Sequence, residues 1–350
     1  MQLWPFWNRA SIERDEPQSS LQLRILSFNI RYATSEPFPN EKPWPERLPR
    51  LVNQLRHETR FLASGLHDVS QSTTSSTVAA SIICLQEVLH AQLIDILASL
   101  NCTNSGSSGN PTDGPYWAHV GVGRDDGHTK GEYSPILYPT IFRLLHSDVV
   151  WLSPTPDRPS KGWDAGSIRI VSIAVLECKA TGQRVLASST HLDNAGPESR
   201  KHSVRIILET LKRVEKEWTK DGDGGLPVFL AGDFNSFPDQ EAYLLMKESG
   251  YVDDLREYVE PEQRYNDSNT FTGFEPEKDK DEQGRIDFIW LGPKDGVRTS
   301  KKKDELPDDL RDASWAVDGY AVLPNVFDDG LYLSDHRCVV GDVYLLHRRA

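Results

Sequence analysis

Cysteine is scarce in this chain, which contains four in 350 residues. Three of them, Cys84, Cys178 and Cys338, lie in apolar runs typical of strands, where a buried free thiol is the expected state. This argues against a disulfide framework and a zinc site, and it indicates a reducing compartment. Because the stretch from Met1 to Arg9 lacks the basic end and long apolar core of a secretory signal, we expect a cytoplasmic or nuclear location.

Long apolar runs and an excess of positive charge are also missing. No stretch of about 18 apolar residues occurs, so no transmembrane helix is expected. Lysine and arginine total 39 against 52 acidic residues, a formal net charge of −13, and they form no extended basic stripe. Since a protein that grips a long duplex usually displaces counterions with a basic face, long-duplex binding is not expected. A short, single-stranded or small phosphorylated substrate is compatible with this charge.

What the chain does contain is a long series of strand-like runs interrupted by a few amphipathic helices. Its 38% hydrophobic residues, nine tryptophans among them, are typical of a globular protein with a large core. Residues 1–20 are polar and irregular, which predicts a mobile tail. No internal repeat or dividing linker follows, so residues 21–350 are predicted to form a single domain.

Periodicity predicts the elements of this domain. Apolar residues at helical spacing predict helices over 44–55, 89–100, 197–218 and 240–247, with Pro45 and Pro49 confining the regular part of the first helix to its later residues. Strands are predicted over 21–30, 81–85, 117–122, 136–144, 168–178, 184–190, 227–231, 285–291, 320–322 and 337–345. Polar stretches over 70–76, 101–115 and 275–284 are predicted loops. Many neighbouring strands have no room for a crossover helix between them, which predicts an α+β layered sandwich of largely antiparallel sheets.

Several of the predicted strands end abruptly in a carboxylate, an amide or an imidazole. The clearest cases are Glu87, the stretch Gly232-Asp233-Phe234-Asn235, and Leu333-Ser334-Asp335-His336 before the last strand. Because an unpartnered carboxylate is costly to desolvate, the repetition indicates that these strand ends converge on one polar site. Such a site suits a hard divalent cation and a phosphate.

Taken one at a time, these residues have ordinary interpretations too. Asn29 ends the first strand and could be a turn or cap amide, and Glu87 could be a surface residue at a strand end. His191 could be a hydrogen-bonded structural residue or a donor to a phosphate or leaving oxygen, with Asp193 orienting it or capping the next segment. Asp233 and Asn235, two apart, can face one side of an extended chain and orient a water and a phosphate oxygen, or form a polar turn.

Asp287 stands inside the apolar run 285–291, and a buried aspartate needs a partner. One candidate is His336, whose tautomer and basicity such a pairing would set. The other is an ordinary ion pair with Arg285 or Arg337.

Together the motifs resemble those of the endonuclease/exonuclease/phosphatase superfamily, and they occur in that family's order. They are Ser27-Phe28-Asn29, Leu85-Gln86-Glu87, Thr190-His191-Leu192-Asp193, Gly232-Asp233-Phe234-Asn235, Arg285-Ile286-Asp287 and Ser334-Asp335-His336. The stretch from Gly131 to Tyr138, and Gly162-Trp163-Asp164 followed by Arg169-Ile170, resemble more loosely the deadenylase and nocturnin-like branch. The resemblance implies two packed mixed sheets flanked by helices, a four-layer deoxyribonuclease-like sandwich, with residues 21–350 as the catalytic domain.

The resemblance also implies a metal and a catalytic group. Glu87 would be the principal ligand of Mg²⁺, with Mn²⁺ as an alternative, and Asp335 would be a second ligand. Asp233 would orient or deprotonate the attacking water. His336, polarised by Asp287, would act as an acid or base or stabilise charge on the phosphorus group.

Substrate contacts are implied for a partly overlapping set of residues. Asn235 and His191 would hold the phosphate oxygens, with His191 also taking part in catalysis. Asn29 and Glu132 would complete the substrate contacts.

These implications lead to a function. The leading hypothesis is a Mg²⁺-dependent phosphodiester hydrolase, an exonuclease-like enzyme acting on single-stranded RNA or another nucleotide substrate. The first alternative is a phosphatase or sphingomyelinase-type phosphoesterase acting on a small or lipid phosphate. The second is a non-catalytic binding domain, against which the full set of acids, amides and imidazoles argues.

Overall fold

The computed structural model describes residues 21–63, 78–102, 117–219, 225–266, 269–277, 280, 282–299 and 313–346. The predicted tail over 1–20 and the predicted loop over 70–76 lie outside these residues, as does the greater part of the predicted loop over 101–115.

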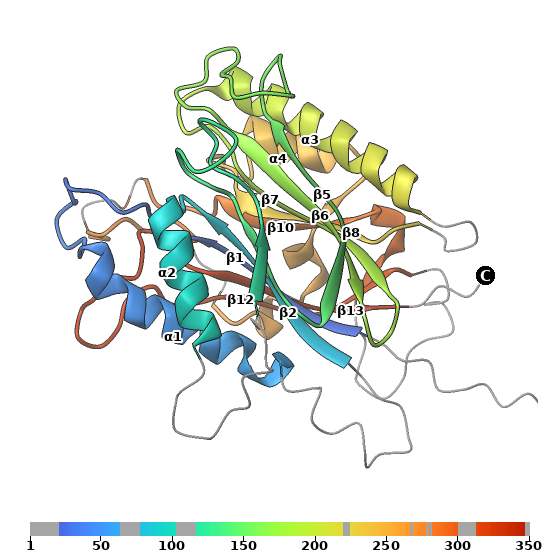
Figure 1. Cartoon of the computed structure of the whole chain (residues 1–350), viewed down its shortest axis with the longest axis horizontal. Helices are drawn as coiled ribbons and strands as arrows, with labels where there is room; N and C mark the ends of the chain where they lie inside the picture. The colour runs from blue at the N-terminus through green and yellow to red at the C-terminus, as the bar shows by residue number, and fades with distance from the viewer. Residues whose placement is uncertain are drawn as a thin grey trace, which may run out of the picture.

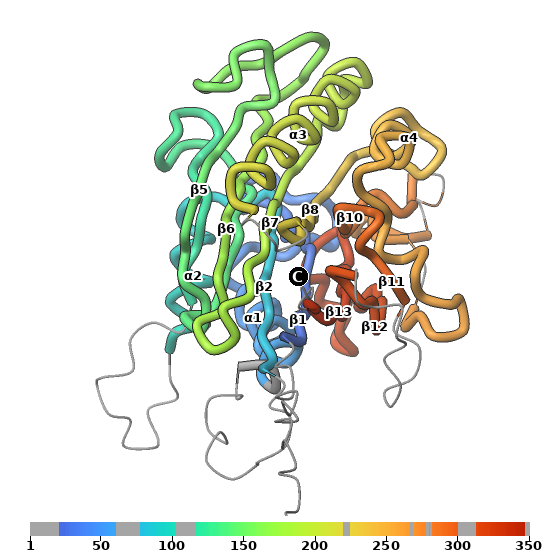
Figure 2. Tube along the Cα trace, turned by 90° about the vertical axis from the view of Figure 1, so that its right-hand side faces the viewer, coloured from blue at the N-terminus to red at the C-terminus, as the bar shows by residue number. Residues whose placement is uncertain are grey.

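Two mixed sheets form the centre of the molecule (Figures 1 and 2). The seven-stranded sheet contains, in spatial order, β11 (Val297–Thr299), β12 (Trp315–Val322), β13 (Val339–Leu345), β1 (Leu21–Asn29), β2 (Val78–Gln86), β4 (Ile136–Pro139) and β3 (Trp117–Val120). The six-stranded sheet contains β5 (Phe142–Trp151), β6 (Ile170–Cys178), β7 (Arg184–His191), β8 (Val228–Asp233), β10 (Asp287–Gly292) and β9 (Asp253–Asp254). Most strand pairs are antiparallel, and the pairs β1–β2, β7–β8 and β11–β12 are parallel.

Helices cover the outer faces of both sheets (Figure 1). The helices α1 (Trp44–Ala63) and α2 (His90–Asn101) pack on the seven-stranded sheet, and α3 (Pro197–Trp218) and α4 (Glu241–Glu248) pack on the six-stranded sheet. Short 3₁₀ helices span Leu255–Tyr258, Pro261–Gln263 and Lys294–Gly296. One hydrophobic cluster fills the space between the sheets, and one lies under each helix pair. The predicted α+β sandwich, two packed mixed sheets flanked by helices, is therefore confirmed.

The predicted strand over 136–144 is wrong as a single element. The chain turns at Thr140 and Ile141, so that β4 belongs to the seven-stranded sheet and β5 to the six-stranded sheet. The continuous apolar run hides this crossing, because both halves are buried in one core and periodicity carries no information about which sheet a strand joins.

The prediction that Pro45 and Pro49 confine the first helix to its later residues is also wrong. The helix α1 begins at Trp44 and runs through Pro49 to Ala63. Pro45 lies in the first turn, where a missing N–H removes no intrahelical bond. Pro49 removes one hydrogen bond near that end, and packing of the helix on the sheet outweighs the loss.

Cys84, Cys178 and Cys338 are buried and form no disulfide, as predicted. Among the described residues, no helix is both long enough and apolar enough to cross a membrane.

Candidate active site

Strand register brings the predicted strand-end residues together. In the parallel pair β1–β2, Asn29 lies opposite Gln86, so that Glu87 follows at the same edge of the sheet. In the other sheet, His191 at the end of β7 lies opposite Asp233 at the end of β8, and Asp287 pairs with Asp233 from β10. The amide of Asn29 donates to Asp233 Oδ2 at 3.0 Å and so joins the two sheets at this point.

Asp233, Asp287 and His336 form the buried centre of the site. His336 Nδ1 lies 2.9 Å from Asp287 Oδ2, and His336 Nε2 lies 3.6 Å from Asp233 Oδ2. The partner of Asp287 is therefore the histidine. The alternative ion pair with Arg285 is not formed, since that guanidinium donates to Asp254 at 2.6 Å.

Burial and charge set the protonation of this centre. Burial by itself lowers the pKa of His336, but the charges of Asp287 and Asp233 outweigh it and raise that pKa to about 10. Burial, together with the charge of Asp287, raises the pKa of Asp233 to about 7. The imidazole is thus held as an imidazolium, which has no lone pair for a metal, beside a carboxylate that can exchange a proton near neutral pH.

A second group of carboxylates lies beside this centre. Glu87 accepts hydrogen bonds from Asn29 Nδ2 at 3.0 Å and from the backbone N–H of Tyr32 at 3.2 Å. Asp335 accepts from Ser334 Oγ at 3.1 Å, and burial, followed by the nearby charge of Glu87, raises its pKa.

These carboxylates fit a hard divalent cation. Burial and the nearby Glu87 carboxylate disfavour the charged form of Asp335, and a bound cation would offset this cost. The donors are oxygens, which Mg²⁺ prefers. Asp233, Asp287 and His336 also place one potential ligand atom each within 4.8 Å of the others, but the imidazolium and its bond to Asp287 favour the Glu87 and Asp335 side.

His191 contacts Asn235 directly. The Asn235 amide donates to His191 Nε2 at 2.9 Å and to the carbonyl of Leu192 at 3.0 Å. Burial, with the charges of Arg169 and Arg124, lowers the pKa of His191 well below its usual value. The neutral ring therefore accepts at Nε2 and orients the amide of Asn235. To donate to a phosphate oxygen, the Asn235 amide must give up its hydrogen bond to His191 Nε2 or its hydrogen bond to the Leu192 carbonyl.

Glu132 is held by arginines that the sequence patterns did not single out for a role. Arg124 Nη1 donates to Glu132 Oε2 at 2.8 Å, and Arg169 Nη1 lies 4.0 Å from the same oxygen. His191 Nδ1 lies 3.8 Å from it. Arg124 lies in a turn and Arg169 comes just before β6, whereas the signal used for the other residues was a polar group that follows an apolar strand.

Two aspartates organise the loops beside His191. Asp193 accepts four backbone N–H groups, those of Gly166, Ser167, Ala195 and Gly196. Asp164 accepts from the backbone of Glu198 and Ser199 and so caps the start of α3. These contacts support the capping interpretation of Asp193 and give a structural role to the Asp of the Gly162-Trp163-Asp164 stretch.

The backbone at the site is strained. Arg31, Glu87 and Asn235 have φ angles of 58°, 59° and 45°, in the left-handed region that non-glycine residues seldom adopt. Each follows the end of one of the strands that build the site. Such a conformation costs about 1–3 kcal/mol per residue and persists only where the surroundings enforce it, which is typical of functional sites.

Arg47 holds two of the site segments in place. Its side chain is fully buried and donates to the carbonyls of Ile30 and Leu333 at 2.7 Å each, and to those of Arg31 and Lys42 at 3.0 Å each. The guanidinium therefore ties the end of β1 to the segment that carries Asp335. Sequence reasoning missed it, because an arginine between apolar helix positions normally faces solvent.

We expect Arg47→Met to lower the free energy of unfolding by about 3 kcal/mol, because it leaves buried carbonyls without donors. Urea unfolding monitored by circular dichroism measures this. Arg50→Met is the matched control on the same helix; it removes an exposed ion pair with Asp329 and should change stability by less than about 1 kcal/mol. Equal effects of the two substitutions would contradict the assigned role of Arg47.

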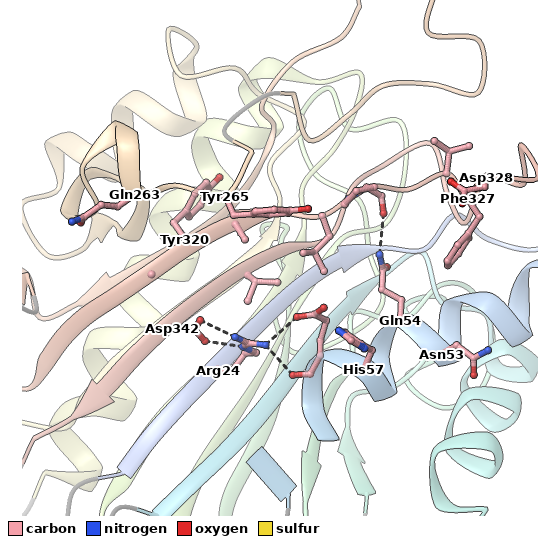
Figure 3. A pocket seen from close by; sticks show the side chains of 17 residues that line it. Arg24, Asn53, Gln54, His57, Gln263, Tyr265, Tyr320, Phe327, Asp328 and Asp342 are labelled. Carbon is pink, nitrogen blue, oxygen red and sulfur yellow. Dashed lines mark hydrogen bonds and ion pairs between the residues drawn. The ribbon is translucent and has the colours of Figure 1, made fainter. Parts of the chain in front are cut away.

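A cavity of about 880 Å³ lies away from this site, between α1 and the outer face of the seven-stranded sheet (Figure 3). Arg24 at its floor donates to Asp342 at 2.8 and 2.9 Å and to Glu58 at 3.0 Å. None of the residues predicted to take part in the chemistry lines it, so we assign it no part in catalysis.

Known proteins resemble this chain over most of its length. The model of the Endonuclease/Exonuclease/phosphatase family matches residues 26–336. A search of curated proteins found no match.

Solved structures match over nearly the whole chain. An endonuclease/exonuclease/phosphatase family protein from Bacteroides thetaiotaomicron is 27% identical, with 95% of this chain and 99% of that chain covered and a TM-score of 0.71. A mannosyl-6-phosphatase from the same organism is 28% identical, with 92% and 99% covered and a TM-score of 0.68. The human Nocturnin catalytic domain, at 17% identity, 93% and 95% coverage and a TM-score of 0.55, shares the fold alone.

Proposed function

The chain belongs to the endonuclease/exonuclease/phosphatase family, a family of hydrolytic phosphoesterases, and from this premise we propose that it is a Mg²⁺-dependent phosphatase for a small, polar phosphate monoester. The observation that carries the proposal is the buried group of Asp233, Asp287 and His336, joined through Asn29 to Glu87. In the proposed reaction this arrangement supplies a proton acceptor, a fixed positive charge and the ligands for a cation.

Each residue then has a task in the hydrolysis. Asp233, with a pKa of about 7, takes a proton from the attacking water, whose oxygen forms the new bond to phosphorus. His336, held as an imidazolium by Asp287, stabilises the negative charge on a phosphoryl oxygen. The ester P–O bond breaks, and the departing alcohol oxygen takes a proton from solvent.

The remaining groups bind and orient. Asn235, oriented by His191, donates to a phosphate oxygen, and Asn29 fixes the positions of Asp233 and Glu87. Held by Glu87 and Asp335, a Mg²⁺ ion would supply charge neutralisation at the phosphate and the leaving oxygen.

The choice of a monoester rests on two supports. A mannosyl-6-phosphatase is among the structures more than 25% identical to this chain. The net charge of −13 favours a small substrate bound by local contacts over a long anionic strand. The exonuclease-like activity on single-stranded RNA that the sequence favoured stays a prediction, because similarity in fold to Nocturnin carries no substrate.

We expect purified protein to release phosphate from a hexose 6-phosphate only with a divalent cation. Chelation by EDTA should lower the rate at least about a thousandfold, and added Mg²⁺ should restore it, because the charge on the phosphate is then neutralised again. Phosphate release is measured with Mg²⁺ and with Mn²⁺, alongside single-stranded RNA and sphingomyelin.

The Glu87→Gln protein, purified in the same way, controls for contaminating phosphatases. Faster cleavage of RNA or sphingomyelin than of every monoester would replace the proposed substrate class. Full activity in EDTA would exclude the metal dependence.

A further inference from the structure

A small pocket opens directly beside the catalytic group. It has a volume of about 150 Å³ and lies between the segment that follows β1 and the loop that precedes β10. Its lining includes Phe38, Phe271, Phe274, Glu275, Glu282 and Asp335, and we call it the Phe38 pocket. A cavity of this size can hold one six-membered ring.

The pocket is built on the catalytic segment. The backbone N–H groups of Thr272 and Gly273 donate to the carbonyl of Asp335 at 2.9 and 3.1 Å. The ring of Phe271 lies 5.0 Å from the ring of His336. A group bound in this pocket therefore has a fixed position relative to the reacting phosphate.

The wall of the pocket that contains Phe38 is also held by several contacts. The Arg31 guanidinium lies 4.9 Å from the ring centre of Phe38 and pairs with Glu41 at 3.3 Å. Glu41 also accepts from the backbone N–H of Phe38 at 3.0 Å, and the Asn40 amide donates to the carbonyl of Phe274 at 3.2 Å, across the pocket. Phe38 nevertheless remains 56% exposed, so a large apolar face is presented beside the catalytic group.

The charge of the lining selects the kind of ring. Glu275, Glu282 and Asp335 contribute carboxylates, and no basic side chain is among the described lining residues. A second phosphate, as in a nucleic acid strand, would meet repulsion here. The Arg31 guanidinium already lies over the Phe38 ring, so that a cationic ligand could not stack on the same ring face. Carboxylates accept hydrogen bonds from hydroxyl groups, and aromatic faces pack on the C–H face of a saturated ring.

The direction of the reaction places the pocket on the leaving-group side. Attacking and leaving oxygens lie roughly in line in phosphoryl transfer. If Asp233 activates the water, we expect the alcohol to depart on the side away from Asp233; the pocket is lined by Asp335, one of the two ligands proposed for the cation at the leaving oxygen. From these observations, and resting on the proposed phosphatase function, we propose that the Phe38 pocket binds the uncharged, hydroxyl-bearing ring of the departing alcohol, so that the substrate is the phosphate ester of a single-ring polyol.

Steady-state kinetics on two monoesters test this: a hexose 6-phosphate, which has the ring, and glycerol 3-phosphate, which lacks it. Phe38→Ala should lower kcat/KM for the hexose phosphate by about tenfold to a hundredfold, mainly through KM, and for glycerol phosphate by less than about threefold. Glu282→Gln should lower the hexose value by about tenfold, because a charged acceptor is lost. Leu244→Ala, which removes an exposed side chain on α4, is the matched control and should change neither.

Binding supplies a readout that needs no turnover. Calorimetry of hexose 6-phosphate with the Glu87→Gln protein should show weaker binding when Phe38→Ala is added. Equal losses on both esters, or unchanged hexose binding, would overturn the pocket assignment while leaving the phosphatase function intact. A wild-type preference for phosphocholine or a dinucleotide, removed by Phe38→Ala, would also overturn it. Absence of hydrolysis of every ester by the wild-type protein, with hexose phosphate still bound through Phe38, would instead reject the proposed function.

Discussion

Glu87→Gln is expected to lower kcat by about a thousandfold or more while the protein still folds. The carboxylate is partly buried and lies with Asp335 where the cation is proposed, so the substitution removes a full ligand charge with almost no change in side-chain size. The amide keeps one acceptor for Asn29 or Tyr32 and places a donor against the other, which should cost about 1–2 kcal/mol of stability.

The measurement is phosphate release at saturating Mg²⁺, with Mg²⁺ binding followed by calorimetry as a second readout. Glu177→Gln is the matched control, because Glu177 is a buried glutamate on β6 that pairs with Arg143 and Arg184 away from the site. It should lose stability without loss of activity. Near-normal turnover of Glu87→Gln, or unchanged Mg²⁺ affinity, would show that Glu87 is not a metal ligand.

His336→Ala should lower kcat by about a thousandfold, and Asp287→Asn by less, about tenfold to a hundredfold. The imidazolium acts on the phosphate directly, whereas Asp287 acts through the imidazole that it holds at 2.9 Å. Asparagine at 287 still accepts from His336 Nδ1 and keeps the ring in place, but it removes the charge that holds the ring protonated.

Two variants keep this comparison interpretable. His336→Ala leaves Asp233 and Asp287 buried without their positive partner, so His336→Gln, which retains an amide donor, is measured beside it, and unfolding is checked by circular dichroism. Asp254→Asn is the control for a buried aspartate outside the site, since it pairs with Arg285. If Asp287→Asn were more damaging than His336→Ala in folded protein, the assignment of roles within the pair would be reversed.

Local sequence pattern predicted a large part of this protein. Alternation of apolar and polar residues and helical spacing depend only on residues close together in the sequence. The α+β sandwich, the four α-helices of the described residues and most strands could therefore be predicted from the sequence. The polar ends of strands were equally visible in the sequence, because a carboxylate directly after an apolar run can be recognised without knowledge of the fold. Asn29, Glu87, Asp233 and His336 were found in this way, and Asp287 was found as an acid inside an apolar run; the structure brings all five together.

Only the tertiary structure decided which of these groups touch. The choice between His336 and Arg285 as the partner of Asp287 depends on how β10 lies against the last segment of the chain, 49 residues away. Arg47, whose contacts reach as far as Leu333, and the Phe38 pocket are likewise made from segments distant in sequence. The residues on either side of them in the sequence do not indicate these contacts, because burial of a polar group is determined by the elements that pack on it. Periodicity identifies the face that a strand or helix buries; the packing of that face against the rest of the chain decides its partners.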